Sequence, residues 1–133
     1  MENNGILDIG GKFLIEYDEE KKLVRISTPG SNKIEISDEK KSITLTDQHN
    51  NEIVMDSNGI TLSSTKDIIL KAKGNISMDA NMKISGAAKQ DVNLDGLNVK
   101  VQAKVGASVK GNATAELSAS GQTTVKGAMV MIN

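Results

Sequence analysis

The second half of this 133-residue chain is built on a two-residue alternation that runs from Ile60 to Asn133 almost without a break. Small and apolar residues occupy every other position, and mainly Lys, Asn, Ser and Asp stand between them. Because side chains on a strand point alternately to opposite faces, this pattern places one continuous apolar stripe opposite a polar one. Ordinary strands span about 3–10 residues. The pattern therefore predicts many short strands joined by tight corners, as in a β-solenoid or β-helix.

The phase of the alternation changes once. Apolar residues hold even positions up to Leu94 and odd positions from Leu97 onward. We interpret this change as a corner or bulge that inserts one extra residue at 95–97. Glycine accepts backbone angles that are closed to other residues. We expect the corners at Gly74, Gly86, Gly96, Gly106, Gly111, Gly121 and Gly127.

The composition indicates a thin interior. The chain has one Phe, one Tyr and no Trp, whereas aromatic side chains normally bury about 150–250 Å² each and dominate globular cores. The formal net charge is −1, which provides no basic field for nucleic acid. The chain has no Cys. We expect no signal peptide, because the apolar stretch at 5–10 is too short and is broken by Asp8. We expect no transmembrane segment, since no apolar run approaches about 18 residues.

Residues 1–56 are expected to form short strands and hairpins that lead into a needle formed by 57–133. Turn-forming clusters of charged and polar residues separate the predicted strands, which lie at 13–17, 23–26, 34–36, 43–46 and 52–55. No segment carries the period of an amphipathic helix over several turns. The residues therefore predict an all-β fold.

Several motifs resemble the C-terminal spike β-helix of VgrG proteins, which belong to type VI secretion systems and are related to the cell-puncturing spike of phage T4. The start of that spike is similar to TPGSNKIEISD at 28–38, SITL at 42–45 and NNEIVMD at 50–56. Its successive repeats are similar to NGITL at 58–62, DIILKA at 67–72 and NISMDA at 75–80. Its blunt tip is similar to SGQTTVKGAMVMIN at 120–133. The resemblance covers 28–133.

Two features differ from full-length VgrG proteins. The baseplate-binding region and the oligonucleotide/oligosaccharide-binding fold that precede the spike are not in this sequence. We therefore expect a spike fragment or a short stand-alone spike. Glycines often recur at intervals of ten or five residues, rather than at the strict octad of the phage T4 spike.

The resemblance implies an intertwined triple-stranded β-helix, a homotrimeric prism in which the apolar stripes of three chains meet on a common axis. A trimer explains how one chain can carry a stripe with too few large residues to cover it, because a repeat that cannot bury its own face needs neighbours. The residues expected in the trimer core are Ile68, Leu70, Ile76, Met78, Met82, Ile84, Val92, Leu94, Val99, Val101, Val105, Val109, Leu117 and Val125.

By the same resemblance, the protein is a non-enzymatic spike of a contractile injection machine that punctures a membrane. It is assembled in the bacterial cytoplasm and then secreted or injected. The implied partner is a PAAR-repeat tip protein, which can carry effectors. The implied contact is formed by Lys126, Gly127, Ala128, Met129, Val130, Met131, Ile132 and Asn133. The alternative is that these residues only complete the core. No cofactor is implied, and the resemblance leaves open structural ions or trapped lipid on the trimer axis.

The residues offer little for metal binding or catalysis. Asp91, Asn93 and Asp95 match the first half of a calcium-binding EF-hand loop, but Gln102 stands where that loop has a bidentate Glu. His49 is the only histidine and lies in a polar turn, so one chain cannot form a zinc site with it. No nucleophile and base are recognisable as a pair. We do not expect an enzyme.

Three other hypotheses stay open at this stage. The first is the spike of a phage or of an extracellular contractile injection system with the same fold. The second is a single-chain right-handed β-helix that binds or cleaves polysaccharide. The third is an adhesin or tail-fibre module that binds a glycan along its shaft. The mass of the protein in solution separates a monomeric β-helix from a trimeric spike.

Overall fold

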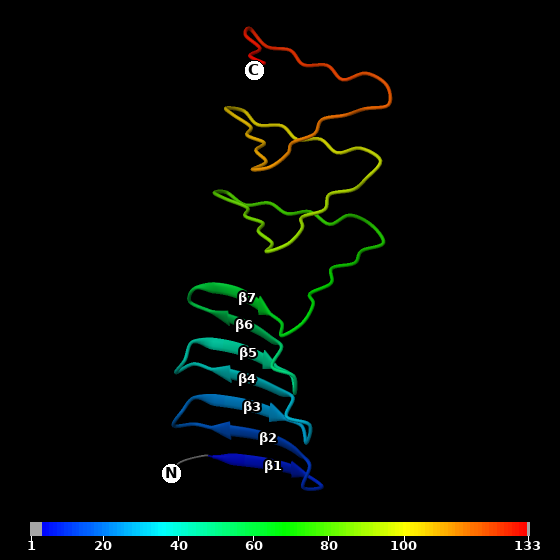
Figure 1. Ribbon diagram of the computed structural model, residues 1–133. Helices are drawn as coiled ribbons and strands as arrows, with labels where there is room; N and C mark the ends of the chain where they lie inside the picture. Colours follow the sequence, from blue (N-terminus) through cyan, green and yellow to red (C-terminus); the bar gives the residue numbers. More distant parts are fainter. Residues whose placement is uncertain (1–3, 133) are drawn as a thin grey trace. The chain divides into compact units, whose positions relative to one another are not determined.

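The computed structural model describes residues 4–132, in two compact units that divide between Met78 and Asp79. The first unit contains a single antiparallel sheet, whose strands lie side by side in chain order (Figure 1). No helix occurs in 4–132, so this part of the chain has no helix that could cross a membrane. The strands are β1 (Gly5–Ile9), β2 (Phe13–Asp18), β3 (Leu23–Ser27), β4 (Lys33–Ser37), β5 (Ser42–Thr46), β6 (Glu52–Asp56) and β7 (Gly59–Ser63).

The sheet is a meander in which each strand pairs with the next one along the chain. Antiparallel neighbours of this kind need only short connections. The register places apolar residues opposite one another. Ile26 pairs with Ile34, and Ile36 pairs with Ile43. A shift by one residue would turn each strand's apolar positions to the other face. The alternation in each strand therefore fixes the register of the whole sheet.

The hairpin turns are stabilised by polar side chains that accept hydrogen bonds from backbone N–H groups. Asp18 Oδ1 accepts a hydrogen bond from the Lys21 N–H at 2.9 Å, and Asp47 Oδ1 accepts one from the Asn51 N–H at 2.9 Å. Short Asp, Asn, Ser and Thr side chains favour turns because they can pair with nearby backbone in this way. The turns thus reverse the chain at positions that the sequence marks with these residues.

The five strands predicted in the first half are confirmed as β2 to β6. β1 was not predicted, because its sequence GILDI places Ile6 beside Leu7 and does not alternate. The sheet also continues beyond residue 56 through β7. Thus the first part of the repetitive sequence forms the last strand of the sheet.

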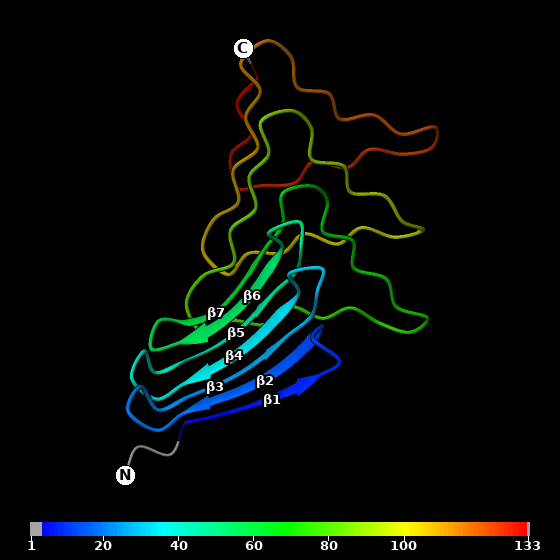
Figure 2. The same ribbon diagram turned by 90° about the horizontal axis from the view of Figure 1, so that it is seen from below.

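After β7 the described chain forms no further strand but bends at regular intervals. It bends at 65–66, 73–74, 81–82 and 89–90, each eight residues after the one before. The next bend, at 96–97, follows after seven residues, and the bends at 104–105, 112–113 and 120–121 return to eight. In Figure 2, residues 79–132 follow wide cornered coils, coloured from yellow-green to red. The bends divide this segment into octads with one seven-residue unit, 89–95.

This spacing corrects two expectations about the corners. Of the seven glycines expected there, only Gly74, Gly96 and Gly121 lie at these bends. The phase of the alternation changes because the unit 89–95 has one residue fewer than the octads, not one more. Adding or removing a residue reverses the parity equally, so the pattern of apolar residues could not distinguish the two.

We number each octad from the first residue of its bend. With this numbering, the apolar residues gather at the fourth, sixth and eighth positions. The fourth position is held by Ile68, Ile76, Ile84, Val92, Val99, Ala107, Ala115 and Thr123. The sixth is held by Leu70, Met78, Gly86, Leu94, Val101, Val109, Leu117 and Val125. Where present, the eighth position is always Ala or Gly. Positions four, six and eight share a face on an extended chain, so each octad presents one apolar edge.

Candidate assembly surfaces

One face of the sheet is lined by two rows of mainly apolar side chains. Pairing between strands aligns the first row as Leu7, Ile15, Ile26, Ile34, Leu45, Ile53 and Leu62. It aligns the second row as Tyr17, Val24, Ile36, Ile43, Met55 and Ile60. Residues two apart on a strand point to the same side. Both rows therefore lie on one side of the sheet, which we call the apolar face.

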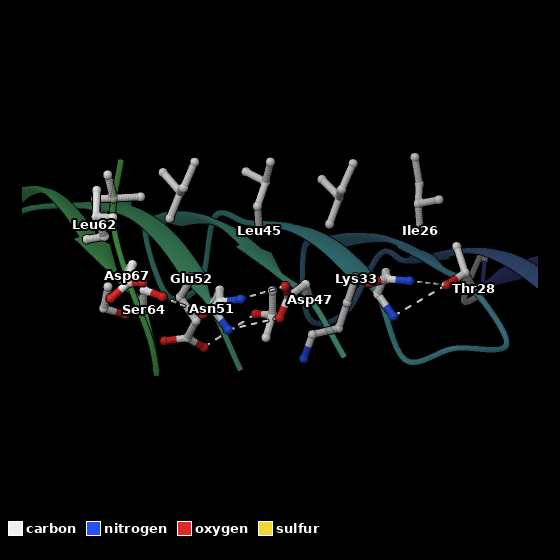
Figure 3. Close-up of a pocket in the computed structure, with 16 residues that line it drawn as sticks. Ile26, Thr28, Lys33, Leu45, Asp47, Asn51, Glu52, Leu62, Ser64 and Asp67 are labelled. Atoms are coloured by element: carbon white, nitrogen blue, oxygen red, sulfur yellow. Dashed lines mark hydrogen bonds between the residues drawn. The ribbon is translucent and has the colours of Figure 1, made fainter. Parts of the chain in front are cut away.

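The apolar face is uncovered in the single chain. In the first row the exposed fraction ranges from 36% for Leu45 to 58% for Leu7. Ile26, Leu45 and Leu62 stand on one side of the sheet in Figure 3, with Lys33 on the other. An open groove of about 580 Å³ runs along the residues drawn there. A continuous apolar surface of this kind marks a place where another surface binds.

The opposite face carries a row of ion pairs across β2, β3 and β4. Glu16, Arg25 and Glu35 are cross-strand neighbours. Arg25 donates to Glu35 Oε2 from Nη2 at 2.8 Å and from Nε at 3.1 Å, and Lys40 Nζ donates to Glu35 Oε1 at 2.9 Å. Glu35 is only 6% exposed. This nearly buried carboxylate therefore has both oxygens paired.

The two cations stabilise the charged form of Glu35. Hydrogen bonds from Lys40, and then from Arg25, lower the pKa of the Glu35 carboxyl from 4.5 to about 2. The hydrogen bond to Glu35 in turn raises the pKa of Arg25. The carboxylate stays ionised at neutral pH and joins β3, β4 and the turn that follows β4. This arrangement is suited to holding the sheet together.

The residues expected in the trimer core fall mostly on the apolar edge of the octads. Twelve of the fourteen occupy the fourth or sixth position, and the exceptions, Met82 and Val105, occupy the second position within a bend. Met82 is 97% exposed, against 57% for its neighbour Ile84. None of the fourteen is buried by the single chain. Because Met82 and Val105 lie in bends and not on the apolar edge, we expect both to face outward in an assembly.

The segment expected to bind a tip protein is exposed as far as the structure describes it. Met129, Val130, Met131 and Ile132 all present apolar side chains to solvent. Asn133 lies outside the described residues. The segment therefore offers apolar contact area in 129–132.

The candidate metal ligands do not come together. Within 4–132, no three His, Cys, Asp or Glu side chains are placed to hold a metal ion. Asp91, Asn93 and Asp95 lie in the exposed unit 89–95, without helices on either side. The His49 N–H donates to Asp47 Oδ1 at 2.7 Å in the turn between β5 and β6. The EF-hand match therefore has no counterpart in the fold.

The surface area of the chain is far larger than that of a compact monomer. Its solvent-accessible surface is 13198 Å². A compact protein of 14.1 kDa exposes about 6,700 Å², and its unfolded chain exposes about 20,000 Å². No apolar side chain in 4–132 is buried. The single chain thus reaches only about half of the burial that a compact domain of its size achieves.

Sequence reasoning missed the apolar face of the sheet as an assembly surface, because the expected core began at Ile68. The signal was present in the sequence. Ile34 and Ile36 flank Glu35, and Ile43 and Leu45 flank Thr44 in the same alternating pattern. Extending the stripe argument to each predicted strand would have identified this face.

No protein-family model and no curated protein matches this sequence. The assignment of function therefore rests on the residues, on the structure and on the motif resemblance described above.

Proposed function

We propose that this protein is a non-enzymatic structural spike of a contractile injection machine, similar to the C-terminal spike of VgrG proteins. Three copies would pack their apolar faces and octad edges around a common axis, as an intertwined triple-stranded β-helix. The observation that carries this proposal is the exposed area of 13198 Å², about twice that of a compact monomer. A surface of this size and apolar character supports obligate association.

The backbone of the needle supports the same conclusion. Among residues 67–132, no backbone–backbone hydrogen bond is formed within the chain. Backbone N–H and C=O groups require partners once they are removed from water. In the trimer, strands of the neighbouring copies would lie between successive coils of one chain and would supply these partners. A single-chain β-helix would pair its own coils, so this observation favours the spike over a monomeric polysaccharide-binding protein.

The spacing of the bends also favours a spike of this kind. Eight residues separate successive bends everywhere except across the unit 89–95, as in the octad of the phage T4 spike. Bending such an assembly would require many hydrogen bonds between chains to yield together. The resulting stiffness would allow axial force to be transmitted through a membrane. A phage spike or an extracellular injection spike would use the same mechanics.

A cysteine-labelling experiment tests the packing of the needle. The chain has no Cys, so a single introduced thiol reports on one position. We expect the thiol of Val99→Cys, at the fourth octad position, to react slowly with a maleimide in the native protein and rapidly after unfolding. The thiol of the matched variant Lys100→Cys should react rapidly in both states. Val99 is exposed in the single chain, so only another chain could protect its thiol. Equal, rapid labelling of both native variants would therefore contradict the proposed packing.

We also propose that residues 126–133 bind a PAAR-repeat tip protein, through which effectors can be carried. A trimer would gather three copies of the apolar segment 128–132 into one platform. Deleting 130–133 should abolish binding of the tip protein while the trimer persists. The measurement is co-purification with a PAAR-repeat protein, together with the mass of the truncated spike. Unchanged binding would refute the assignment of these residues.

A further inference from the structure

Charge is distributed unevenly along the needle. Residues 57–95 contain five lysines and four aspartates, whereas 96–133 contain four lysines and one glutamate. We call 96–133 the distal segment. Its side chains carry a net charge of +3, although the whole chain carries −1. Three copies together would concentrate nine positive charges in the distal segments of one needle.

The distal lysines are exposed and have no acidic partner. All ion pairs among residues 4–132 lie between residues 16 and 40, within the sheet and its turns. Lys100, Lys104 and Lys110 are exposed and form no ion pair. Their charge is therefore not neutralised within the chain.

The octad places these lysines away from the apolar edge. Lys100 occupies the fifth position, Lys104 the first and Lys110 the seventh. None lies at the fourth, sixth or eighth position, where the apolar and small residues gather. Packing of the apolar edges on a common axis would leave all three lysines on the outside of the needle.

We propose that Lys100, Lys104 and Lys110 bind anionic lipid headgroups at the surface of the target membrane. This inference rests on the proposed function, because the trimer brings the three sets of lysines together. Cationic side chains near an anionic leaflet are attracted to its phosphates, and several such charges act together. The distal segment would thereby hold the needle at the membrane that it enters.

The absence of aromatic residues argues against a single-stranded nucleic acid as the polyanion. The distal segment contains no Phe, Tyr or Trp, so it has no platform on which the bases of a single-stranded nucleic acid could stack. Lys100 also precedes Lys126 by about three octads, which separates it along the chain from the segment proposed to bind the tip protein.

Sedimentation with lipid vesicles tests this inference. The trimeric protein should bind vesicles that contain phosphatidylglycerol and should not bind vesicles of phosphatidylcholine alone. Replacing Lys100, Lys104 and Lys110 by Gln should lower the partition coefficient by about tenfold or more. The matched control replaces Lys71, Lys73 and Lys83 by Gln, which removes the same charge from residues 57–95. This control should bind vesicles nearly as well as the unaltered protein.

Equal losses in both triple variants would overturn the inference, because binding would then follow net charge alone. Displacement from the vesicles by inorganic phosphate at constant ionic strength, or tighter binding to duplex DNA, would overturn the assignment to lipid headgroups. The mass of each variant is measured in parallel. A trimer that ignores anionic vesicles would contradict only this inference, whereas a monomer would contradict the proposed function.

Discussion

At the scale of single residues, Glu35 combines low exposure with a full set of charged partners. Its two oxygens are paired with Arg25 and Lys40, and Glu16 contacts the same guanidinium at 3.4 Å. A buried carboxylate is costly unless it is paired and hydrogen-bonded. Removing its charge leaves two cations without their main partner. We therefore expect Glu35 to matter more to stability than the other acidic residues of the sheet.

The variant Glu35→Gln should lower the free energy of unfolding by about 1.5–3 kcal/mol at neutral pH, since hydrogen bonds to charged groups contribute about that amount. Folding lowers the pKa of Glu35 from 4.5 to about 2. The ionised carboxylate therefore stabilises the fold fully above about pH 4.5, and this contribution is lost as the pH falls through 2. Denaturant unfolding at several pH values measures the difference between the two proteins.

Glu39→Gln is the matched control, because Glu39 lies in the adjacent turn, is exposed and forms none of the ion pairs of the cluster. It should unfold like the unaltered protein at every pH. A Glu35→Gln protein that is equally stable at pH 7, or equally destabilised at pH 2 and pH 7, would contradict the role of the carboxylate.

The ion-pair cluster could not be predicted from the sequence. Arg25 precedes Glu35 by ten residues, and such a spacing indicates contact only once the strand register is known. The apolar rows were predictable in principle, because alternation within each strand determines which side chains share a face. What the sequence lacked was a signal for which charged residues would meet on the other face.

At the scale of elements, the needle is a series of octads whose positions differ in role. The bends, not the glycines, define the repeat: Gly86 stands at the sixth position, where most octads have a larger apolar residue. The alternation predicted an apolar stripe but not its phase relative to the corners. Parity alone therefore placed Met82 and Val105 in the expected core, whereas the octad places them in bends.

The pair Ile84→Ala and Met82→Ala tests this difference in role. Ile84 occupies the fourth position and should be buried in the trimer, so its truncation should cost about 2–4 kcal/mol per chain. Met82 occupies the second position and should face solvent in the trimer, so its truncation should cost less than about 0.5 kcal/mol. The midpoints of denaturant unfolding of the assembled protein give both values. A larger loss for Met82→Ala would show that the octad phase is wrong.

For the whole molecule, the proposal of assembly rests on the apolar surface that one chain leaves exposed. The all-β class was predictable from periodicity, and the structure confirms it. The number of chains was not predictable from periodicity, because an apolar stripe indicates that a partner is needed without specifying how many. The proposal of three copies comes from the motif resemblance. The extent of exposed apolar surface is the physical reason for proposing that one copy does not suffice.

The mass of the native protein in solution shows whether three chains assemble. Size-exclusion chromatography with light scattering, at micromolar chain concentration, should give three times the mass of one chain. Obligate assembly of this kind also links folding to association. A folded monomer at the same concentration would rule out the trimer, because it would show that the apolar face and the octad edges need no other chain to cover them.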